Sequence, residues 1–351
     1  MRGHICLAAQ RKARTHACNR WTRLRRGILF VGAAVLGIVS SCPAHADPPP
    51  DPHRIVTLQV ENDATAGTDR YYTSGLRLGY TTPTGGLPDG LARLGQALFG
   101  AGQQRLALGL SQLLFTPRNT QIAPPDPRDR PYAGLLLGNV ALIHDTDRAR
   151  SVIDLDLGVI GPAALGKQLQ NGFHHLIGQG PNRGWGSQLP NQPVAEVLAS
   201  RVWRLPIASA GPLEFDALPT LTAGLGTWRV YGLAGGQVRM GQGLASDFGT
   251  PLIAPGLNGW DAYNATRPFA WYVFAGIDGQ AVGFDETIDG EPFRSTPHVS
   301  RIPAIGEFQA GIAVMAFGLR ISFTDVVRSR EFHGQAGGPF QYGSASVSFK
   351  F

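Results

Sequence analysis

Cysteine is absent from most of this 351-residue chain, and acidic residues are absent from its beginning. All three cysteines (Cys6, Cys18 and Cys42) lie within residues 1–46. The same segment holds eight of the 31 basic residues and none of the 25 acidic ones, which leaves 23 basic and 25 acidic residues for the rest. The net positive charge of the chain therefore comes from its first segment. Residues 47–351 are not basic, so net charge gives no support to nucleic-acid binding.

Long hydrophobic runs are also missing. The longest run, residues 27–39, has about 13 apolar residues, fewer than the ~20 that a membrane-spanning helix needs. It follows a basic region and precedes Ala44-His45-Ala46, a small-x-small cleavage pattern. We predict that residues 1–46 are a signal peptide and that residues 47–351 form one exported domain without disulfides. In an alternative interpretation, Val39 to Cys42 form a lipoprotein box and Cys42 is lipidated.

The composition excludes two further classes of protein. The 46 glycines and 26 prolines are too many for a helical bundle, and a hydrophobic content of 43% is too high for a disordered chain. Segments of about ten residues instead alternate apolar and polar side chains, as strands do. Twelve such segments predict strands: 54–61, 73–80, 105–111, 132–143, 152–160, 194–205, 213–223, 227–238, 269–278, 305–315, 319–326 and 343–351.

The polar rows of these strands fit two architectures. Arg77, Asp154 and Asp156 lie mid-strand, opposite apolar rows. In a soluble sandwich the polar row would face water, whereas in an outer-membrane barrel it faces the lumen and the apolar row faces lipid. The export signal, the lack of cysteine and a last strand ending in Phe351 favour the barrel. We predict an all-β fold, a closed antiparallel transmembrane β-barrel of about twelve strands in the outer membrane; a periplasmic β-sandwich is the alternative.

Aromatic residues gather near the ends of the predicted strands. Outer-membrane barrels carry aromatic girdles at both membrane interfaces. We therefore predict such girdles here, formed by Trp203, Trp228, Tyr231, Phe269, Trp271 and Tyr272.

One segment, residues 162–177, departs from the alternation. Its apolar residues Leu165, Leu169 and Phe173 recur at a spacing of four, which predicts a short helix. Irregular backbone cannot face lipid, so this insert must lie at a rim or inside the mouth of the barrel. Asn171 and His174 are three residues apart and share one face of the helix. Histidine is the usual general base, although a hydrogen-bonded rim histidine is the alternative.

The first predicted hairpin carries hard oxygen donors. Asn62 and Asp63 end its first strand, and Thr73 opens its second. The connecting loop is short, so the two strands are antiparallel neighbours and these three residues share one rim. Carboxylate, amide and hydroxyl oxygens suit Ca²⁺ or Mg²⁺ better than zinc. We expect a metal site here; ordinary turn residues are the alternative.

The loop before residues 132–143 is basic. Arg118, Arg128 and Arg130 lie in or beside a proline-rich segment. A guanidinium group matches phosphate with two parallel hydrogen bonds, so an anionic lipid head group is a natural partner. Solvated or structural arginines are the alternative.

Taken in order along the chain, several short motifs resemble those of the outer-membrane lipid A 3′-O-deacylases. They cover nearly all of residues 47–351 and occur in the order of that family. The matching segments are Val60-Glu61-Asn62-Asp63, Asp69-Arg70-x-Tyr72-Thr73-Ser74-Gly75-x-Arg77-x-Gly79-Tyr80, Asp129-Arg130-Pro131-Tyr132-Ala133-Gly134, Gly158-Val159-Ile160-Gly161-Pro162 and Gln170-Asn171-x-x-His174.

The resemblance implies a twelve-stranded barrel with its active site at the outer-leaflet rim. It also implies Ca²⁺-dependent hydrolysis of the 3′-linked acyloxyacyl ester of lipid A. Asn62, Asp63 and Thr73 match the calcium-site and active-site residues of the family, and His174 matches its catalytic histidine. The family's functional lysine lies in the loop after the third strand, but residues 116–130 contain no lysine. Arg118 could supply the positive charge, although arginine and lysine are not equivalent.

The resulting hypothesis is a membrane-embedded, monomeric lipid A deacylase. His174 takes a proton from the attacking water as general base, and Asn62 orients the site. Calcium, held partly by Asp63 and Thr73, polarises the ester carbonyl. Arg118 and Arg130 bind the phosphates of lipid A in the outer leaflet. A non-catalytic barrel, structural or pore-forming, and an outer-membrane phospholipase are the alternatives.

Overall fold

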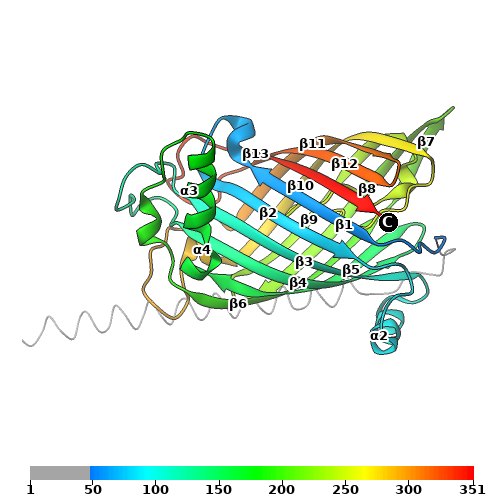
Figure 1. Ribbon diagram of the computed structural model, residues 1–351, viewed down its shortest axis with the longest axis horizontal. Coiled ribbons are helices and arrows are strands. Elements are labelled where there is room, and N and C mark those ends of the chain that lie inside the picture. The colour runs from blue at the N-terminus through cyan, green and yellow to red at the C-terminus, as the bar shows by residue number, and fades with distance from the viewer. Residues whose placement is uncertain (1–47) are drawn as a thin grey trace, which may run out of the picture.

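The computed structural model describes residues 48–351, so the predicted signal peptide and the Cys42 alternative lie outside the described residues. The strands form one antiparallel sheet, whose neighbours are mostly consecutive in sequence (Figure 1). They are β1 (Ile55–Asn62), β2 (Tyr71–Thr81), β3 (Gln103–Thr116), β4 (Ala133–Asp145), β5 (Ala149–Ile160), β6 (Gln192–Trp203), β7 (Leu205–Ala210), β8 (Leu213–Gly226), β9 (Arg229–Gln242), β10 (Phe269–Asp285), β11 (Ala304–Ala316), β12 (Leu319–Arg328) and β13 (Phe340–Lys350).

Two pairings close this sheet into a barrel. β1 pairs with β13, and β6 pairs with β8. Only Arg204 separates β6 from β7, and both strands pair with β8, so they act as one interrupted strand. The barrel thus has twelve strand positions, which confirms the predicted fold and overturns the β-sandwich alternative.

The helices are short and lie outside the sheet. They are α2 (Asp89–Phe99), α3 (Gly166–Leu176) and α4 (Glu286–Asp289), with 3-10 turns η1 (Asp63–Ala66), η2 (Pro162–Ala164), η3 (Gly184–Ser187) and η4 (Leu244–Ser246). α3 falls within the predicted helical segment, whereas α2 was not predicted. Among residues 48–351, no helix is long and apolar enough to cross a membrane.

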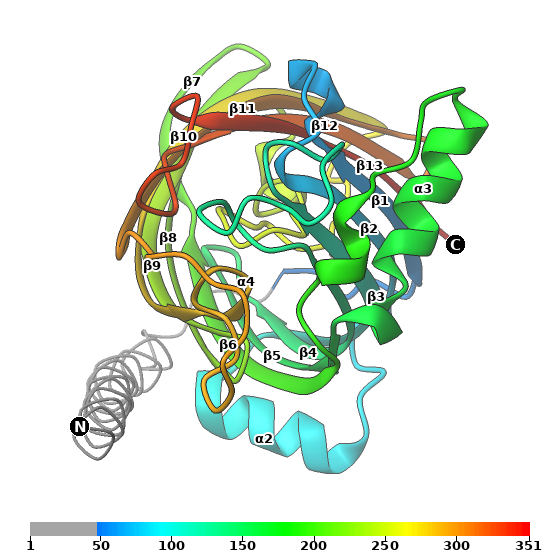
Figure 2. The same ribbon diagram turned by 90° about the vertical axis from the view of Figure 1, so that its left-hand side faces the viewer.

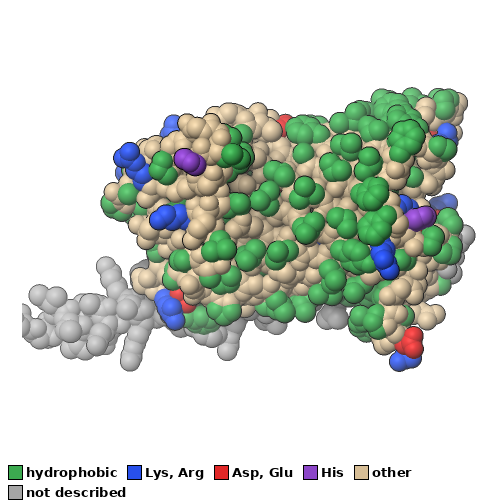
Figure 3. Space-filling view, in the orientation of Figure 1, with side chains coloured by type: hydrophobic (Ala, Val, Ile, Leu, Met, Phe, Trp, Pro, Cys, Tyr) green, Lys and Arg blue, Asp and Glu red, His purple; other side chains and the backbone are tan. Residues whose placement is uncertain are grey.

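The side chains of the barrel wall are arranged inside out. Leu58, Leu78 and Leu157 are 57%, 56% and 56% exposed on the outer surface, whereas Arg77 and Asp154 are buried in the lumen. Hydrophobic side chains cover the flank of the barrel, and charged ones gather near its ends (Figure 3). This is the arrangement of a barrel that faces lipid outside and polar groups inside. The predicted assignment of the two strand faces is therefore confirmed.

The predicted aromatic girdles are only partly correct. Phe269 is exposed, and Trp203 and Trp271 are partly exposed. The other three predicted residues, Trp228, Tyr231 and Tyr272, are buried inside the barrel. Position near a strand end does not determine which face a residue occupies, because each step along a strand reverses the side chain.

The two ends of the barrel differ. We call the end that carries η1 and α3 the α3 rim, and the opposite end, where Asp51 contacts Lys350 near the C-terminus, the terminal rim. Figure 2 looks onto the α3 rim, where α3 lies along the outer edge of the barrel beside β2 and β3, and α4 lies near β6. At the terminal rim three connections are tight turns, at 146–148, 211–212 and 317–318.

The long connection between β9 and β10, residues 243–268, folds into the lumen; we call it the plug. Arg77 forms a buried ion pair with Asp261 of the plug. Arg239 contacts Asp247 of the plug at 2.7 Å, and Glu61 accepts hydrogen bonds from the backbone N–H groups of Ile253 and Ala254. A lumen filled in this way differs from the water-filled interior of a diffusion pore.

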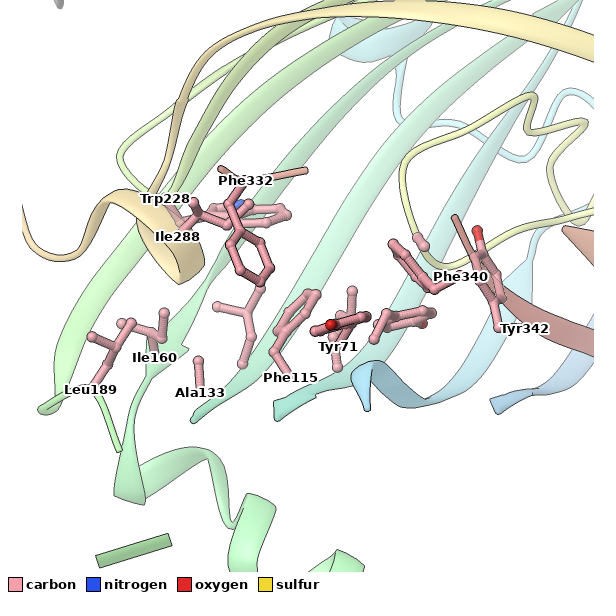
Figure 4. Packing of buried hydrophobic residues seen from close by; sticks show 14 of the residues in the cluster. Tyr71, Phe115, Ala133, Ile160, Leu189, Trp228, Ile288, Phe332, Phe340 and Tyr342 are labelled. Carbon is pink, nitrogen blue, oxygen red and sulfur yellow. The ribbon is translucent and has the colours of Figure 1, made fainter. Parts of the chain in front are cut away.

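An aromatic cluster fills the lumen toward the α3 rim (Figure 4). The ring of Tyr71 meets those of Phe332 and Phe340 edge to face, at centroid distances of 5.7 and 5.8 Å. Below the cluster, a cavity of ≈ 90 Å³ lies between the plug and the wall, lined by polar residues such as Asp154 and Glu196 and by apolar ones such as Leu252. The α3 rim therefore rests on a packed floor, which fixes the strand ends that carry the candidate site.

Candidate active site

The first hairpin holds its three predicted site residues close together. Asn62 ends β1 and caps η1, since its Oδ1 accepts from the N–H of Ala64 at 2.7 Å. Its Nδ2 donates to the carbonyl oxygen of Thr73 at 2.9 Å, which ties the two strands together. Thr73 lies at an irregularity of β2, where the pairing with β3 shifts. Its hydroxyl donates to the carbonyl of Leu114 at 3.2 Å, which leaves hydroxyl lone pairs for another partner.

Asp63 is a buried carboxylate without a cationic partner. Its side chain is 2% exposed, and its Oδ2 accepts from the N–H of Arg70 and the hydroxyl of Thr68, each at 2.7 Å. Burial, together with the nearby charge of Asp69, raises its pKa to about 8 against the lowering effect of these hydrogen bonds. A carboxylate held only by neutral donors is stabilised by a proton or by a bound cation.

The helix α3 presents a polar face to the barrel and an apolar face outward. Its buried residues are Gly166, Gln170 and His174, four apart, whereas Phe173 and Leu176 are 52% and 81% exposed. Gly166 is required at the contact, since an added Cβ would lie 2.8 Å from the ring of Trp185. In the apolar row that predicted the helix, Leu165 and Phe173 therefore face outward, whereas Leu169 packs partly against the buried ring of Trp185. His174 faces inward.

The ring of His174 is buried and held by one hydrogen bond. It is 8% exposed, and its Nδ1 lies 3.2 Å from the carbonyl oxygen of Gly180. A carbonyl oxygen only accepts, so Nδ1 carries the proton and Nε2 carries the free lone pair. Among residues 48–351 no hydrogen bond reaches Nε2. The ring is thus fixed in orientation while one nitrogen is left for a proton.

Asp69 connects the first hairpin to α3, a role that sequence reasoning missed. Its Oδ1 accepts from Gln170 and its Oδ2 from Asn182, both at 2.9 Å. Gln170 in turn accepts from the indole N–H of Trp185 at 2.8 Å. Asn171, predicted to share a face with His174, accepts from the N–H of Asn182 at 2.9 Å and so holds the loop after α3. The only sequence signal was the presence of Asp69 in a family motif.

Asp63 and His174 lie at the same rim but do not touch. The described residues contain no hydrogen bond or ion pair between their side chains. They are linked indirectly, because Asp63 accepts from Arg70, whose neighbour Asp69 binds Gln170 one helical turn before His174. The first hairpin and α3 therefore lie at one rim, and a shared role for Asp63 and His174 stays a prediction.

The two arginines predicted to bind substrate occupy different environments. Arg118 is exposed, and its backbone N–H donates to Asp129 at 2.8 Å. Arg130 is 1% exposed; its guanidinium pairs with Glu331 at 2.8 Å, donates to Thr287 and lies over the ring of Phe115. Its groups are thus engaged inside the barrel, which corresponds to the structural alternative and offers no surface to a head group.

Among the described residues, no group of three or more His, Cys, Asp or Glu side chains is arranged to hold a metal ion. The oxygens of Asp63 and Thr73 are nevertheless the hard donors that calcium prefers, and the buried Asp63 lacks a counter-charge. The residues present fit calcium in chemistry, with carbonyl oxygens or water required for the other ligand positions.

Comparison with known proteins agrees with this architecture. The family model described as outer membrane protein LpxR matches residues 29–351. The solved structure of LpxR from Salmonella typhimurium matches with a TM-score of 0.71 at 20% identity, over 85% of this chain and 100% of that one. The translocator domain of autotransporter NalP from Neisseria meningitidis matches with a TM-score of 0.37 at 13% identity, over 97% and 98%. A search of curated proteins by sequence finds no match.

The family model spans the whole described barrel, and the Salmonella protein shares its fold. The resemblance predicted from the ordered motifs is thereby confirmed. This chain belongs to the LpxR family of outer-membrane proteins.

Proposed function

We propose that this chain is an outer-membrane lipid A 3′-O-deacylase, which hydrolyses the 3′-linked acyloxyacyl ester with His174 as general base. The observation that carries the proposal is the state of His174: a buried imidazole with Nδ1 fixed on the Gly180 carbonyl and Nε2 free, at the rim that also carries Asn62, Asp63 and Thr73. Family membership supports the same activity.

The rim suits a substrate that lies in a membrane. The connections at the terminal rim include three tight turns, as periplasmic turns do, so we assign the α3 rim to the outer face. The ester carbonyls of a lipid lie between its head group and its acyl chains, at the height where the barrel wall gives way to the rim. The outward apolar residues of α3, such as Phe173 and Leu176, would contact acyl chains beside the site.

His174 would take a proton from water at Nε2, and that water would attack the ester carbonyl carbon. The Gly180 carbonyl would stabilise the imidazolium through Nδ1–H. Calcium, when bound at Asp63 and Thr73, would polarise the carbonyl and stabilise the oxyanion. Asn62 would keep the two strand ends in register through its hydrogen bond to Thr73.

The anionic sugar phosphates of the substrate call for a cation outside the barrel. Arg118 is exposed at the α3 rim, as are Lys167 on α3 and Arg183 in the following loop. Arg118 would take the place of the family's loop lysine and donate hydrogen bonds to a phosphate of the substrate. Arg130 is not included, because its guanidinium is buried in an ion pair.

The mass spectrum of lipid A from cells that express the protein tests the proposal. Expression of the wild-type chain should remove the 3′-linked acyloxyacyl group, and EGTA should stop turnover reversibly. His174→Ala should reduce deacylation by about 10²–10⁴-fold while leaving a folded, heat-modifiable barrel. Exposed His175 on the same helix provides the matched control, since His175→Ala should keep full activity. Unchanged lipid A in wild-type cells would favour a non-catalytic barrel, and cleaved phospholipids would indicate a phospholipase.

A further inference from the structure

The helix α2 packs on the outer face of the barrel wall at the terminal rim. Along β4, Val140, Leu142 and His144 all point outward, because side chains alternate along a strand. Val140 is 46% exposed, whereas Leu142 and His144 are 8% and 2% exposed. Phe99 of α2 has its ring centroid 5.3 Å from that of His144. A Cβ added to Gly95 of α2 would lie 3.2 Å from Leu142. The helix therefore covers the wall where the exposed outward row of β4 ends.

The connection that carries α2, residues 82–102, is longer than closure of the barrel requires. Three other connections at the terminal rim, 146–148, 211–212 and 317–318, are tight turns. α2 is drawn at full length in Figure 2, which looks along the barrel, and is foreshortened in Figure 1, which looks across it. Its axis therefore runs parallel to the plane of the membrane that the barrel spans. Amphipathic helices at membrane interfaces lie in this orientation.

The side chains of α2 fall into three sectors around the helix axis. The sector that faces the wall consists of Ala92, Gly95 and Phe99. The leucine sector, on one side of it, consists of Leu91, Leu94 and Leu98. The polar sector, on its other side, consists of Asp89, Arg93 and Gln96. At about 100° per residue, the leucine and polar sectors each lie about a quarter of a turn from the wall-facing sector.

The contacts with the wall show which of these sectors faces the membrane. Within the wall-facing sector, Gly95 is the residue nearest the leucines, and it lies against Leu142. Phe99 is nearer the polar side chains, and it lies against His144. Leu142 is closer than His144 to the exposed Val140 by one step along the outward row, ~7 Å. The leucine sector therefore faces the lipid side, and the polar sector faces away from the membrane.

We propose that α2 is an interfacial helix, which inserts its leucine sector among the lipid acyl chains of the leaflet at the terminal rim. Leu91 and Leu94 are 37% and 49% exposed in the described part of the chain. Their sector continues the outward row of the wall, and the partner of that row is lipid. Asp89 and Arg93 lie in the sector directed away from the acyl chains, where head groups and water solvate their charges.

An inserted α2 has a consequence for the opposite end of the barrel. β4 contacts α2 at the terminal rim and α3 at the α3 rim. A helix held in one leaflet therefore sets the height of this strand in the bilayer, and with it the height of α3. The inference rests on the packing of α2 alone, so its test is independent of the proposed deacylation.

Quenching of a site-specific fluorophore by brominated lipid tests the proposal. Residues 47–351 contain no cysteine, so Leu94→Cys and Gln96→Cys each provide one site for a bimane label, and the unsubstituted barrel reports labelling elsewhere. The labelled barrels are reconstituted into phosphatidylcholine liposomes with or without bromine on the acyl chains. The label at residue 94 should be quenched about as strongly as one at the outward-facing Leu78→Cys. It should be quenched about threefold more than the label at residue 96, because an interfacial helix buries its apolar face by ~5–10 Å.

Heat-modifiable migration shows that each labelled barrel is folded. Equal, weak quenching at residues 94 and 96 would place the leucine sector in water and overturn the proposal, and equal, strong quenching would do so by removing the orientation of the helix. Blue-shifted emission at residue 94 without bromine quenching would mean that protein, such as a second copy of the chain, covers the sector, which also overturns it. Leu91→Gln should reduce the quenching at residue 94 and leave that at residue 78 unchanged, which separates loss of insertion from damage to the wall.

Discussion

Two buried aspartates show that negative charge is compensated in the lumen but not at the α3 rim. Asp247 in the plug is 1% exposed and lies between Arg239 and Arg320, with the hydroxyl of Tyr272 at 2.9 Å. Asp63 at the α3 rim is 2% exposed, yet only neutral donors reach it. The first carboxylate is compensated by protein cations and locks the plug in place. The second is left for a proton or a metal ion, as expected of a functional group.

The largest expected effect is the loss of a luminal cation. Arg239 contacts Asp216 at 2.6 Å and Asp247 at 2.7 Å, and all three side chains are buried. Arg239→Ala would leave buried Asp216 without its ion pair and Asp247 with Arg320 at 3.4 Å, so we expect a loss of about 3–5 kcal/mol in the free energy of unfolding. Urea unfolding of the barrel in micelles, followed by tryptophan fluorescence, measures it. Arg267→Ala removes an exposed pair with Glu214 and should cost under ~1 kcal/mol; equal losses in the two variants would contradict the comparison.

The next effect concerns the carboxylate without a cation. Asp63→Asn keeps the shape of the side chain and an acceptor for Arg70, so the barrel should fold with wild-type stability. Its turnover of lipid A should fall by roughly 10²-fold or more, because the oxyanion loses its metal. Added calcium should no longer stimulate the variant. Asp126→Asn changes an exposed carboxylate paired with Arg128 and serves as control; calcium-stimulated turnover at the control rate in Asp63→Asn would remove Asp63 from the site.

The ion-paired carboxylate of Asp51, which lies outside the membrane-spanning strands, should make the stability of the barrel depend on pH. Burial alone would raise the pKa of Asp51, but Lys350, His53 and Arg105 outweigh it and hold the pKa below the ordinary value of 3.8. Its contribution to stability is therefore complete above pH 3.8 and is lost as pH falls through the lower, folded-state pKa. Asp51→Asn should destabilise the barrel by about 2 kcal/mol at pH 7. This difference should shrink toward zero in strongly acidic urea titrations, and a difference that grows in acid would refute the assignment.

Loss of the hydrogen bonds that link the first hairpin to α3 should have a smaller effect on turnover. Gln170 and Asn182 both donate to the native carboxylate of Asp69. In Asp69→Asn the amide nitrogen cannot accept a hydrogen bond, so one of these two hydrogen bonds is lost. A shifted α3 should lower kcat by about 10-fold, since a small misplacement of a catalytic group is costly. The calcium concentration for half-activation should shift less than kcat, because Asp63 keeps its own hydrogen bonds and loses only the nearby charge of Asp69. A change in calcium affinity with kcat intact would mean that Asp69 acts at the metal and not through the helix.

The barrel could be predicted from sequence because its signal is local. Each strand, such as 152–160, repeats with period two within ten residues, and the spacing of four at Leu165 and Leu169 marks α3. The plug has no such signal. Its contacts join residues far apart, such as Arg77 and Asp261, which are separated by 184 positions.

The sequence also could not predict which charged groups near the site are buried. Arg118 and Arg130 belong to the same basic loop, and nothing in that stretch distinguishes the exposed guanidinium from the buried one. The partner of Arg130 is Glu331, 201 residues further along the chain. The role of Asp69 likewise depends on Asn182, which reaches the hairpin only after the chain has passed through α3. Family motifs identified candidate residues, whereas only the fold shows which of them have no internal partner.

The smallest expected effect distinguishes the roles of Arg118 and Arg130, the two arginines of the basic loop before β4. Arg118→Ala removes an exposed guanidinium that makes no ion pair within residues 48–351, so stability should be unchanged. A phosphate contact at the membrane surface is exposed and screened, so KM for lipid A should rise only a few-fold with kcat near the wild-type value. Arg118→Lys should restore most of this loss. Arg130→Ala should instead lower stability, because buried Glu331 would lose its pair at 2.8 Å and keep Arg328 at 3.4 Å. A wild-type KM in Arg118→Ala would mean that the basic loop has a structural role only.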